Sequence, residues 1–206
     1  MAGRRDRKSV EERRTERAAI DDPAVVLDAA ARFLEARPRS MAEVRRRLGR
    51  AGYRAELVEG AIARLIELGM LDDAAFAAQW VESRDRAHPR GEHALIVELR
   101  QMGIDAQTIA ATLRARRDAA ARWDGEAPPP VDGPPPNADQ AAARKLLARH
   151  ARTIDRIADP RARRQRAYAL LARNGFDPET CRSTSAEVGR EPDPEVPGED
   201  PDADVD

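Results

Sequence analysis

Three segments of this sequence share one pattern: a leucine, a glycine four residues later, and a large apolar residue directly after the glycine. The copies are Leu48, Gly52 and Tyr53; Leu99, Gly103 and Ile104; and Leu171, Gly175 and Phe176. Each follows a stretch with helical apolar periodicity. Glycine adopts the left-handed conformation that closes a helix, and the next apolar residue packs back on the last turn. The chain is therefore predicted to contain three copies of one helix–turn unit.

The apolar pattern continues beyond each glycine at matching distances. Six residues later stand Val58, Ile109 and Cys181, and ten residues later stand Ile62, Leu113 and Ser185. Residues four apart share one face of a helix, so a second helix is predicted after each turn. Cys181, the only cysteine, is interpreted as a small core residue rather than a reactive thiol. Ser185 interrupts the third stripe, which predicts a short or frayed last helix.

A further predicted helix precedes each copy, at residues 22–38, 72–88 and 138–154. Asp22 and Asp72 suit the capping position of a helix, and Pro23 suits a first turn. Aromatic residues make up only 3% of the chain, whereas Ala, Leu, Arg and Glu, which favour helix, dominate. We predict an all-α fold of three tandem three-helix repeats that form a helical solenoid.

The remaining segments have compositions that do not support a folded core. Residues 125–137 hold two runs of three prolines, which exclude helix and favour an extended spacer. Both ends of the chain are too charged to bury enough apolar surface to become ordered. The predicted organisation is a charged mobile N-terminal arm (1–21), repeat 1 (22–70), repeat 2 (71–124), a Pro-rich linker (125–137), repeat 3 (138–187) and an acidic disordered tail (188–206).

The sequence offers little material for catalysis. The three histidines, His88, His93 and His150, lack the three- or four-residue spacing that places two imidazoles on one metal. The glycines form neither a Walker loop nor a dinucleotide fingerprint. We therefore expect a protein that is not an enzyme and that uses no metal or other cofactor. With one cysteine and no signal-like or membrane-spanning apolar run, a cytoplasmic location with no membrane partner is expected.

Arginine dominates the basic residues: of 36 Lys and Arg, two are lysine. The candidate binding residues fall in three clusters, one per repeat: Arg45, Arg46 and Arg50; Arg84, Arg86 and Arg90; and Arg163 and Arg164. A charge run is often only a solvated helix face. Clusters at related places in three repeats instead favour one electropositive surface and a polyanionic partner.

The middle of the sequence resembles the RecX family of recombination regulators. The resemblance rests on LDDAAFAAQWVESR (71–84) and PRGEHALIVELRQMGI (89–104). It includes Asp72, Asp73, Phe76, Ala77, Trp80, Val81, Arg84, Arg90, Gly91, Glu98, Leu99, Gly103 and Ile104. In repeat 1, the stretch SMAEVRRRL contributes Ser40, Glu43 and Leu48. The likeness covers about residues 22–187 and is weaker in repeat 3.

The resemblance implies a curved array of repeats that lies in the groove of a RecA–DNA filament. Such a protein would inhibit ATP hydrolysis, strand exchange and co-protease activity, with weak DNA binding that is direct or mediated by the filament. We expect it to be a monomer. Two alternatives stay open from the sequence. One is a DNA-binding regulator with helix-turn-helix-like units, and the other is a helical adaptor whose arginines are merely solvated.

Overall fold

The computed structural model describes residues 9–121 and 137–189. Within these residues helix is the only regular secondary structure. Nearly all of the predicted Pro-rich linker (125–137) and of the predicted acidic tail (188–206) lies outside them, as does the start of the predicted N-terminal arm.

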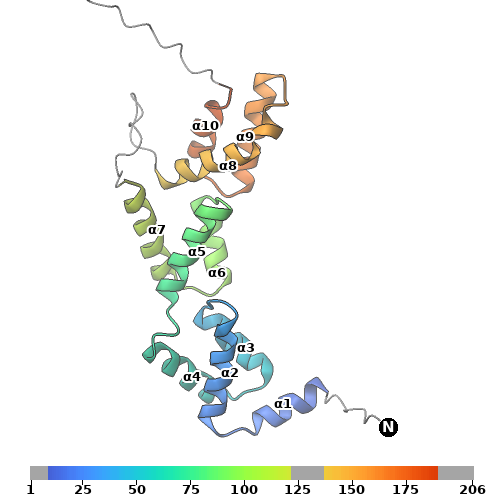
Figure 1. Cartoon of the computed structure of the whole chain (residues 1–206), viewed down its shortest axis with the longest axis vertical. Helices are drawn as coiled ribbons and strands as arrows, with labels where there is room; N and C mark the ends of the chain where they lie inside the picture. The colour runs from blue at the N-terminus through green and yellow to red at the C-terminus, as the bar shows by residue number, and fades with distance from the viewer. Residues whose placement is uncertain (1–8, 122–136, 190–206) are drawn as a thin grey trace, which may run out of the picture.

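The helices form three groups of three, preceded by one additional helix. Repeat 1 contains α2 (Pro23–Glu35), α3 (Met41–Ala51) and α4 (Ala55–Glu67); repeat 2 contains α5 (Asp73–Ala87), α6 (Glu92–Gln101) and α7 (Ala106–Ala121); repeat 3 contains α8 (Ala138–Ile154), α9 (Pro160–Arg173) and α10 (Pro178–Ala186). The groups follow one another along a curved column, with α1 at one end (Figure 1). The predicted all-α solenoid of three-helix repeats is confirmed.

The shared glycines close α3, α6 and α9 as their spacing predicted. Gly52, Gly103 and Gly175 have φ angles of +104°, +84° and +79°. In each turn the residue after the glycine donates its backbone N–H to the carbonyl of the leucine, for example Tyr53 to Leu48 at 3.3 Å. This six-residue hydrogen bond explains the fixed spacing of leucine, glycine and apolar residue.

Each repeat has its own apolar core, because each helix buries only the stripe that faces its two neighbours. All six residues predicted to continue the stripes are buried: Val58, Ile62, Ile109, Leu113, Cys181 and Ser185. Cys181 is fully buried, as predicted for a core residue, and its thiol lies 3.5 Å from the Phe176 carbonyl oxygen. Helix α10 has 9 residues, fewer than α4 or α7, as its interrupted stripe predicted.

The N-terminal segment differs from the predicted mobile arm, because α1 (Val10–Ala18) is a helix. Ser9 and Glu12 form a reciprocal capping box: the Ser9 hydroxyl accepts from the Glu12 N–H at 3.1 Å, and the Glu12 carboxylate accepts from the Ser9 N–H. This cap satisfies backbone donors that would otherwise be exposed. The arm was predicted to be mobile because it has little apolar surface to bury, and α1 indeed buries none of its residues. The helix is stabilised instead by its cap and by its contact with α3.

Candidate binding surface

Repeat 1 and repeat 2 are joined at the start of α3. The buried Ser40 hydroxyl caps α3 by accepting from the Glu43 N–H at 3.1 Å and donates to the Met102 carbonyl of repeat 2 at 2.6 Å. The Met41 N–H donates to the Asp73 carboxylate at 2.8 Å. Burial raises the pKa of Asp73, and this amide partly opposes the rise. Two hydrogen bonds from one helix start therefore fix repeat 2 against repeat 1.

Repeat 2 and repeat 3 are joined by the same kind of contact at the start of α6. The Gly91 N–H donates to the Asn174 carbonyl at 3.0 Å, and the Glu92 N–H donates to the Asp139 carboxylate at 3.0 Å. Asp139 thus corresponds to Asp73, since each lies at the beginning of the first helix of the next repeat. The two joints have equivalent positions in the fold: in each, the start of one repeat's second helix bonds to the C-cap residue of the next repeat's second helix and to an aspartate at the start of that repeat's first helix.

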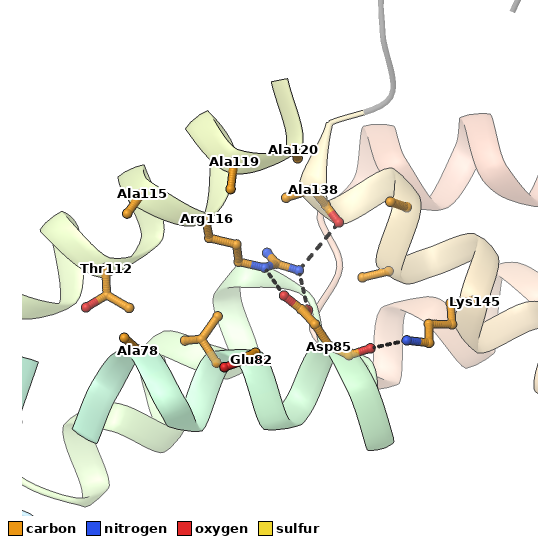
Figure 2. A pocket seen from close by; sticks show the side chains of 13 residues that line it. Ala78, Glu82, Asp85, Thr112, Ala115, Arg116, Ala119, Ala120, Ala138 and Lys145 are labelled. Carbon is orange, nitrogen blue, oxygen red and sulfur yellow. Dashed lines mark hydrogen bonds and ion pairs between the residues drawn. The ribbon is translucent and has the colours of Figure 1, made fainter. Parts of the chain in front are cut away.

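A buried arginine adds to the second joint. The Arg116 side chain, only 6% exposed, lies between α5, α7 and α8 beside an alanine-rich cavity of about 470 Å³. Figure 2 shows its guanidinium between Asp85 and the start of α8. It donates twice to Asp85, both at 2.9 Å, and once to Asp139 at 2.5 Å. Burial lowers the pKa of Arg116, but these two carboxylates outweigh burial and raise it, so the residue stays charged.

The predicted arginines of repeat 1 divide into paired and unpaired side chains. Arg45 donates to Glu59 at 2.5 and 2.7 Å, and these hydrogen bonds raise the pKa of Arg45. Arg46 and Arg50 are exposed, and neither has an ion pair within the described residues. Arg46 lines a cavity of about 570 Å³ together with Arg84 of repeat 2. The structure therefore brings two predicted site residues from different repeats to one cleft.

The predicted arginines of repeat 2 all have partners inside the protein. Arg84 donates to Glu98 at 2.7 Å, and its guanidinium lies 4.3 Å from the centre of the Trp80 ring. Arg90 approaches the same Glu98 at 3.6 Å and donates to Asn174 of repeat 3 at 2.7 Å. Arg86 pairs with Glu82, one turn earlier on α5. Arg84 and Arg90 thus support the fold, and an exposed surface role for them requires that they exchange these partners.

In repeat 3, Arg163 donates to the Ile157 carbonyl at 3.0 Å. Arg164 is exposed, and the described part of the chain gives it no ion pair. Of the eight predicted residues, Arg46, Arg50 and Arg164 are the ones whose guanidinium groups have no hydrogen-bond partner within the described residues. They mark the surface best prepared to bind an external anion, because no internal contact must be broken first.

Models of three consecutive protein domains match the chain in order. The first three-helix domain of RecX matches residues 27–65, the second matches residues 72–113, and the third matches residues 138–184. A protein of Mycobacterium avium (strain 104) named Regulatory protein RecX is 36% identical over 163 residues, which cover 78% of this chain and 83% of that protein. This chain belongs to the RecX family.

Other RecX proteins and a RecX crystal structure also match this chain. The Regulatory protein RecX of Thermobifida fusca (strain YX) is 34% identical over 70% of this chain and 68% of its own length. That of Mycobacterium sp. (strain JLS) is 42% identical over 93 residues, so the match spans half of that relative's length. A crystal structure of RecX from Lactobacillus salivarius has a TM-score of 0.63 at 18% identity, covering 81% of this chain and 96% of that one. The RecX fold is thus retained although most residues differ.

Residues 9–121 and 137–189 contain neither a metal-binding cluster nor a membrane-spanning helix. Among these described residues, no group of three or more His, Cys, Asp or Glu side chains has an arrangement that would hold a metal ion. None of the described helices is both long enough and apolar enough to cross a membrane.

The sequence did not single out Arg116 or the arginines of α1. Arg116 lies in a stretch of charged and small residues, and its partners Asp85 and Asp139 are 31 and 23 residues away. The α1 residues did carry a usable signal, because Ser9 and Glu12 match a capping box. That signal predicts a helix start even in a segment with almost no apolar residues.

Proposed function

We propose that this RecX-family chain is a regulatory protein without catalytic activity that binds a RecA–DNA filament and inhibits its ATP hydrolysis, strand exchange and co-protease activity. The observation that carries the proposal is the match of all three RecX three-helix domains in their order. Relatives that are 34% and 36% identical to this chain are named Regulatory protein RecX.

The geometry of the column supports an extended polymer as the partner. Two equivalent joints hold the repeats at fixed spacing, so the exposed arginines of repeats 1 and 3 are presented at a constant separation. A helical filament offers binding positions at regular intervals, and a rigid array of repeats matches such intervals without losing much conformational entropy on binding. A flexible chain would lose more conformational entropy on binding.

The test is inhibition of the ATPase activity of RecA on single-stranded DNA, titrated with the full-length chain. We expect inhibition well below one copy per RecA protomer, because a column of three repeats would contact more than one protomer. Absence of inhibition at equimolar protein would overturn the proposal.

A binding comparison separates this function from DNA regulation. The affinity for RecA-coated single-stranded DNA is measured beside that for naked DNA at the same salt concentration, because phosphate contacts depend strongly on salt. Tighter binding to the coated DNA supports the proposal. Equal or tighter binding to naked DNA would favour a DNA-binding regulator.

A further inference from the structure

Five arginine residues line one cavity between α1 and α3, and of these Arg50 alone belongs to the eight predicted binding residues described above. The cavity has a volume of about 390 Å³, and its arginines are Arg13, Arg14 and Arg17 from α1, and Arg47 and Arg50 from α3. The other described residues that line it are Val10 and Ala51, so the described part of the chain places no carboxylate in its wall. We call it the α1–α3 arginine site.

The spacing of α1 explains why its arginines share the cavity. Val10, Arg13, Arg14 and Arg17 occupy positions i, i+3, i+4 and i+7, which form one face of a helix. Glu11 and Glu12 lie off this face, and Glu12 is engaged in the capping box with Ser9. Helix α1 therefore has about as many acids as bases but presents a basic face to α3.

Helix α1 is held at this place by polar and backbone contacts. Arg17 donates to the Ala51 carbonyl at the end of α3 at 3.2 Å, and its guanidinium lies 5.7 Å from the centre of the Tyr53 ring. The backbone of Arg14 lies so close to Gly52 that a Cβ there would come within 2.8 Å of the Arg14 carbonyl oxygen. Gly103 and Gly175 face Ala42 and Ala94 of the preceding repeat in the same way. Helix α1 thus takes the place of a preceding repeat.

Apolar burial does not account for the position of α1. The helix has no buried residue, and Val10 is 67% exposed. Bringing five guanidinium groups to one cavity costs electrostatic free energy, because like charges repel. Apart from Arg17, none of the five has a hydrogen bond or ion pair from its side chain within the described residues; Arg47 lies 5.7 Å from the Phe33 ring centre. A bound polyanion would offset this repulsion.

We propose that the α1–α3 arginine site binds consecutive phosphates of a single nucleic-acid strand. Guanidinium groups bind phosphate oxygens through paired, charge-assisted hydrogen bonds. A nucleic-acid strand carries one charge per nucleotide at short regular intervals, whereas the carboxylates of an acidic protein segment follow no such regular repeat. Several adjacent phosphates would therefore satisfy five nearby arginines better than an acidic protein segment. This site acts on naked strands and does not depend on the proposed action on RecA.

The test measures binding of a fluorescently labelled oligothymidylate of twenty nucleotides to the full-length chain by anisotropy, without recombinase. The variant is Arg13→Gln with Arg14→Gln, since neither side chain has a hydrogen bond to residues 9–121 or 137–189. The control is Arg32→Gln with Arg64→Gln, which removes the same charge from exposed residues paired with Asp28 and Glu67. Circular dichroism checks that helix content is unchanged in both.

We expect the Arg13/Arg14 variant to bind on the order of tenfold more weakly at low salt, and the control to change little. The slope of log affinity against log salt should become shallower by about 1.4, because about 0.7 of a counterion is released per phosphate contact on a single strand. Equal affinity and slope for the variant and the control would overturn the proposal. So would stronger competition by polyglutamate than by unlabelled oligothymidylate, which would indicate an acidic protein partner.

The same variant separates this proposal from the proposed function. Loss of oligothymidylate binding with retained inhibition of the RecA ATPase would support the site and leave the proposed function standing. Normal oligothymidylate binding by the variant, in a chain that inhibits RecA, would overturn the site alone.

Discussion

Gly91, in the turn before α6, lies directly against Gly175, in the turn after α9, so a Cβ atom on Gly91 would collide with the Gly175 carbonyl oxygen. Gly91 has a φ of −71°, a conformation open to any residue, so the contact and not the backbone angle requires glycine here. The atoms in the way belong to the main chain of the neighbouring repeat, which cannot change rotamer as a side chain can.

Gly91→Ala should therefore destabilise the joint between repeats 2 and 3 by about 1–3 kcal/mol, the usual cost of overpacking. The matched control is Gly60→Ala, because Gly60 is in the interior of α4 with nothing within 4 Å of a new Cβ. That change should stabilise the protein by about 0.5–1 kcal/mol. Denaturant unfolding of both variants measures the difference, and equal stability of Gly91→Ala and the parent would contradict the contact.

Ser40 and Ser9 both cap helices through capping boxes, but only Ser40 also connects two repeats. Ser40→Ala should lose about 1–2 kcal/mol for the cap and about 1 kcal/mol more for the hydrogen bond to Met102. Ser9→Ala should lose only the cap of a short exposed helix. Thermal unfolding of the two variants compares these costs, and a larger loss for Ser9→Ala would show that the bond between repeats contributes nothing.

The carboxylate of Glu43 gives the first joint a dependence on pH. Burial raises the pKa of Glu43, but hydrogen bonds from Arg37 and from the Ser40 backbone outweigh burial and lower it below its ordinary value. A lowered pKa in the folded state stabilises the protein above the unfolded pKa, and this stabilisation is lost as the pH falls through the folded pKa. The window therefore lies below about pH 4.5.

Glu43→Gln should accordingly be less stable than the parent at neutral pH, and the difference should shrink as the pH is lowered below 4.5. Unfolding midpoints measured for both proteins from pH 7 to pH 3 test this. Glu67→Gln, on the exposed end of α4, serves as the control. A stability difference between Glu43→Gln and the parent that grows as the pH falls would contradict this prediction.

Arg46, Arg50 and Arg164 are expected to contribute most to filament binding among the predicted arginines, since their side chains need not leave an internal partner. Replacing all three by glutamine should weaken binding to RecA-coated DNA at least tenfold if each contact contributes about 0.5–1 kcal/mol. The control replaces Arg32, Arg64 and Arg144, which are exposed and paired with Asp28, Glu67 and Glu187. Co-sedimentation with filaments compares the two variants. Equal retention of both would show that Arg46, Arg50 and Arg164 do not contribute to the filament-binding surface.

The acidic end of the chain is expected to compete for the basic surfaces. Residues 183–206 hold nine acids and one base, after a segment, 138–182, with eleven basic and five acidic residues. A tethered polyanion has an effective concentration on the order of millimolar beside its own fold. Deleting residues 189–206 should therefore tighten binding to single-stranded DNA at low salt.

The gain from this deletion should decrease as salt rises, because the Debye length is about 10 Å at 0.1 M and shorter above it. Anisotropy of labelled DNA across a salt series compares the intact and shortened chains. Identical curves at every salt concentration would mean that the acidic residues make no competing contact.

The sequence by itself determined the helices of the three repeats and how they begin and end. Helix α3 ends at a six-residue hydrogen bond from the Tyr53 N–H to the Leu48 carbonyl, with Gly52 in the turn, and it begins at the Ser40–Glu43 capping box. Such signals are local, so spacing alone predicts them. The division into three cores followed from stripes such as Val58 and Ile62, because each repeat buries its stripe within itself.

Only the tertiary structure decided which arginines are available. Arg45 is paired with a residue 14 positions away, and Arg90 with one 84 positions away, so neither pairing leaves a periodic trace in the sequence. Position 91 likewise requires glycine because the backbone of another repeat lies where a side chain would be. The sequence sets the charge and the size of each side chain. The groups that pair with these arginines, and the backbone that leaves no space for a side chain at position 91, come from distant segments that only the packing of the helices and repeats brings together.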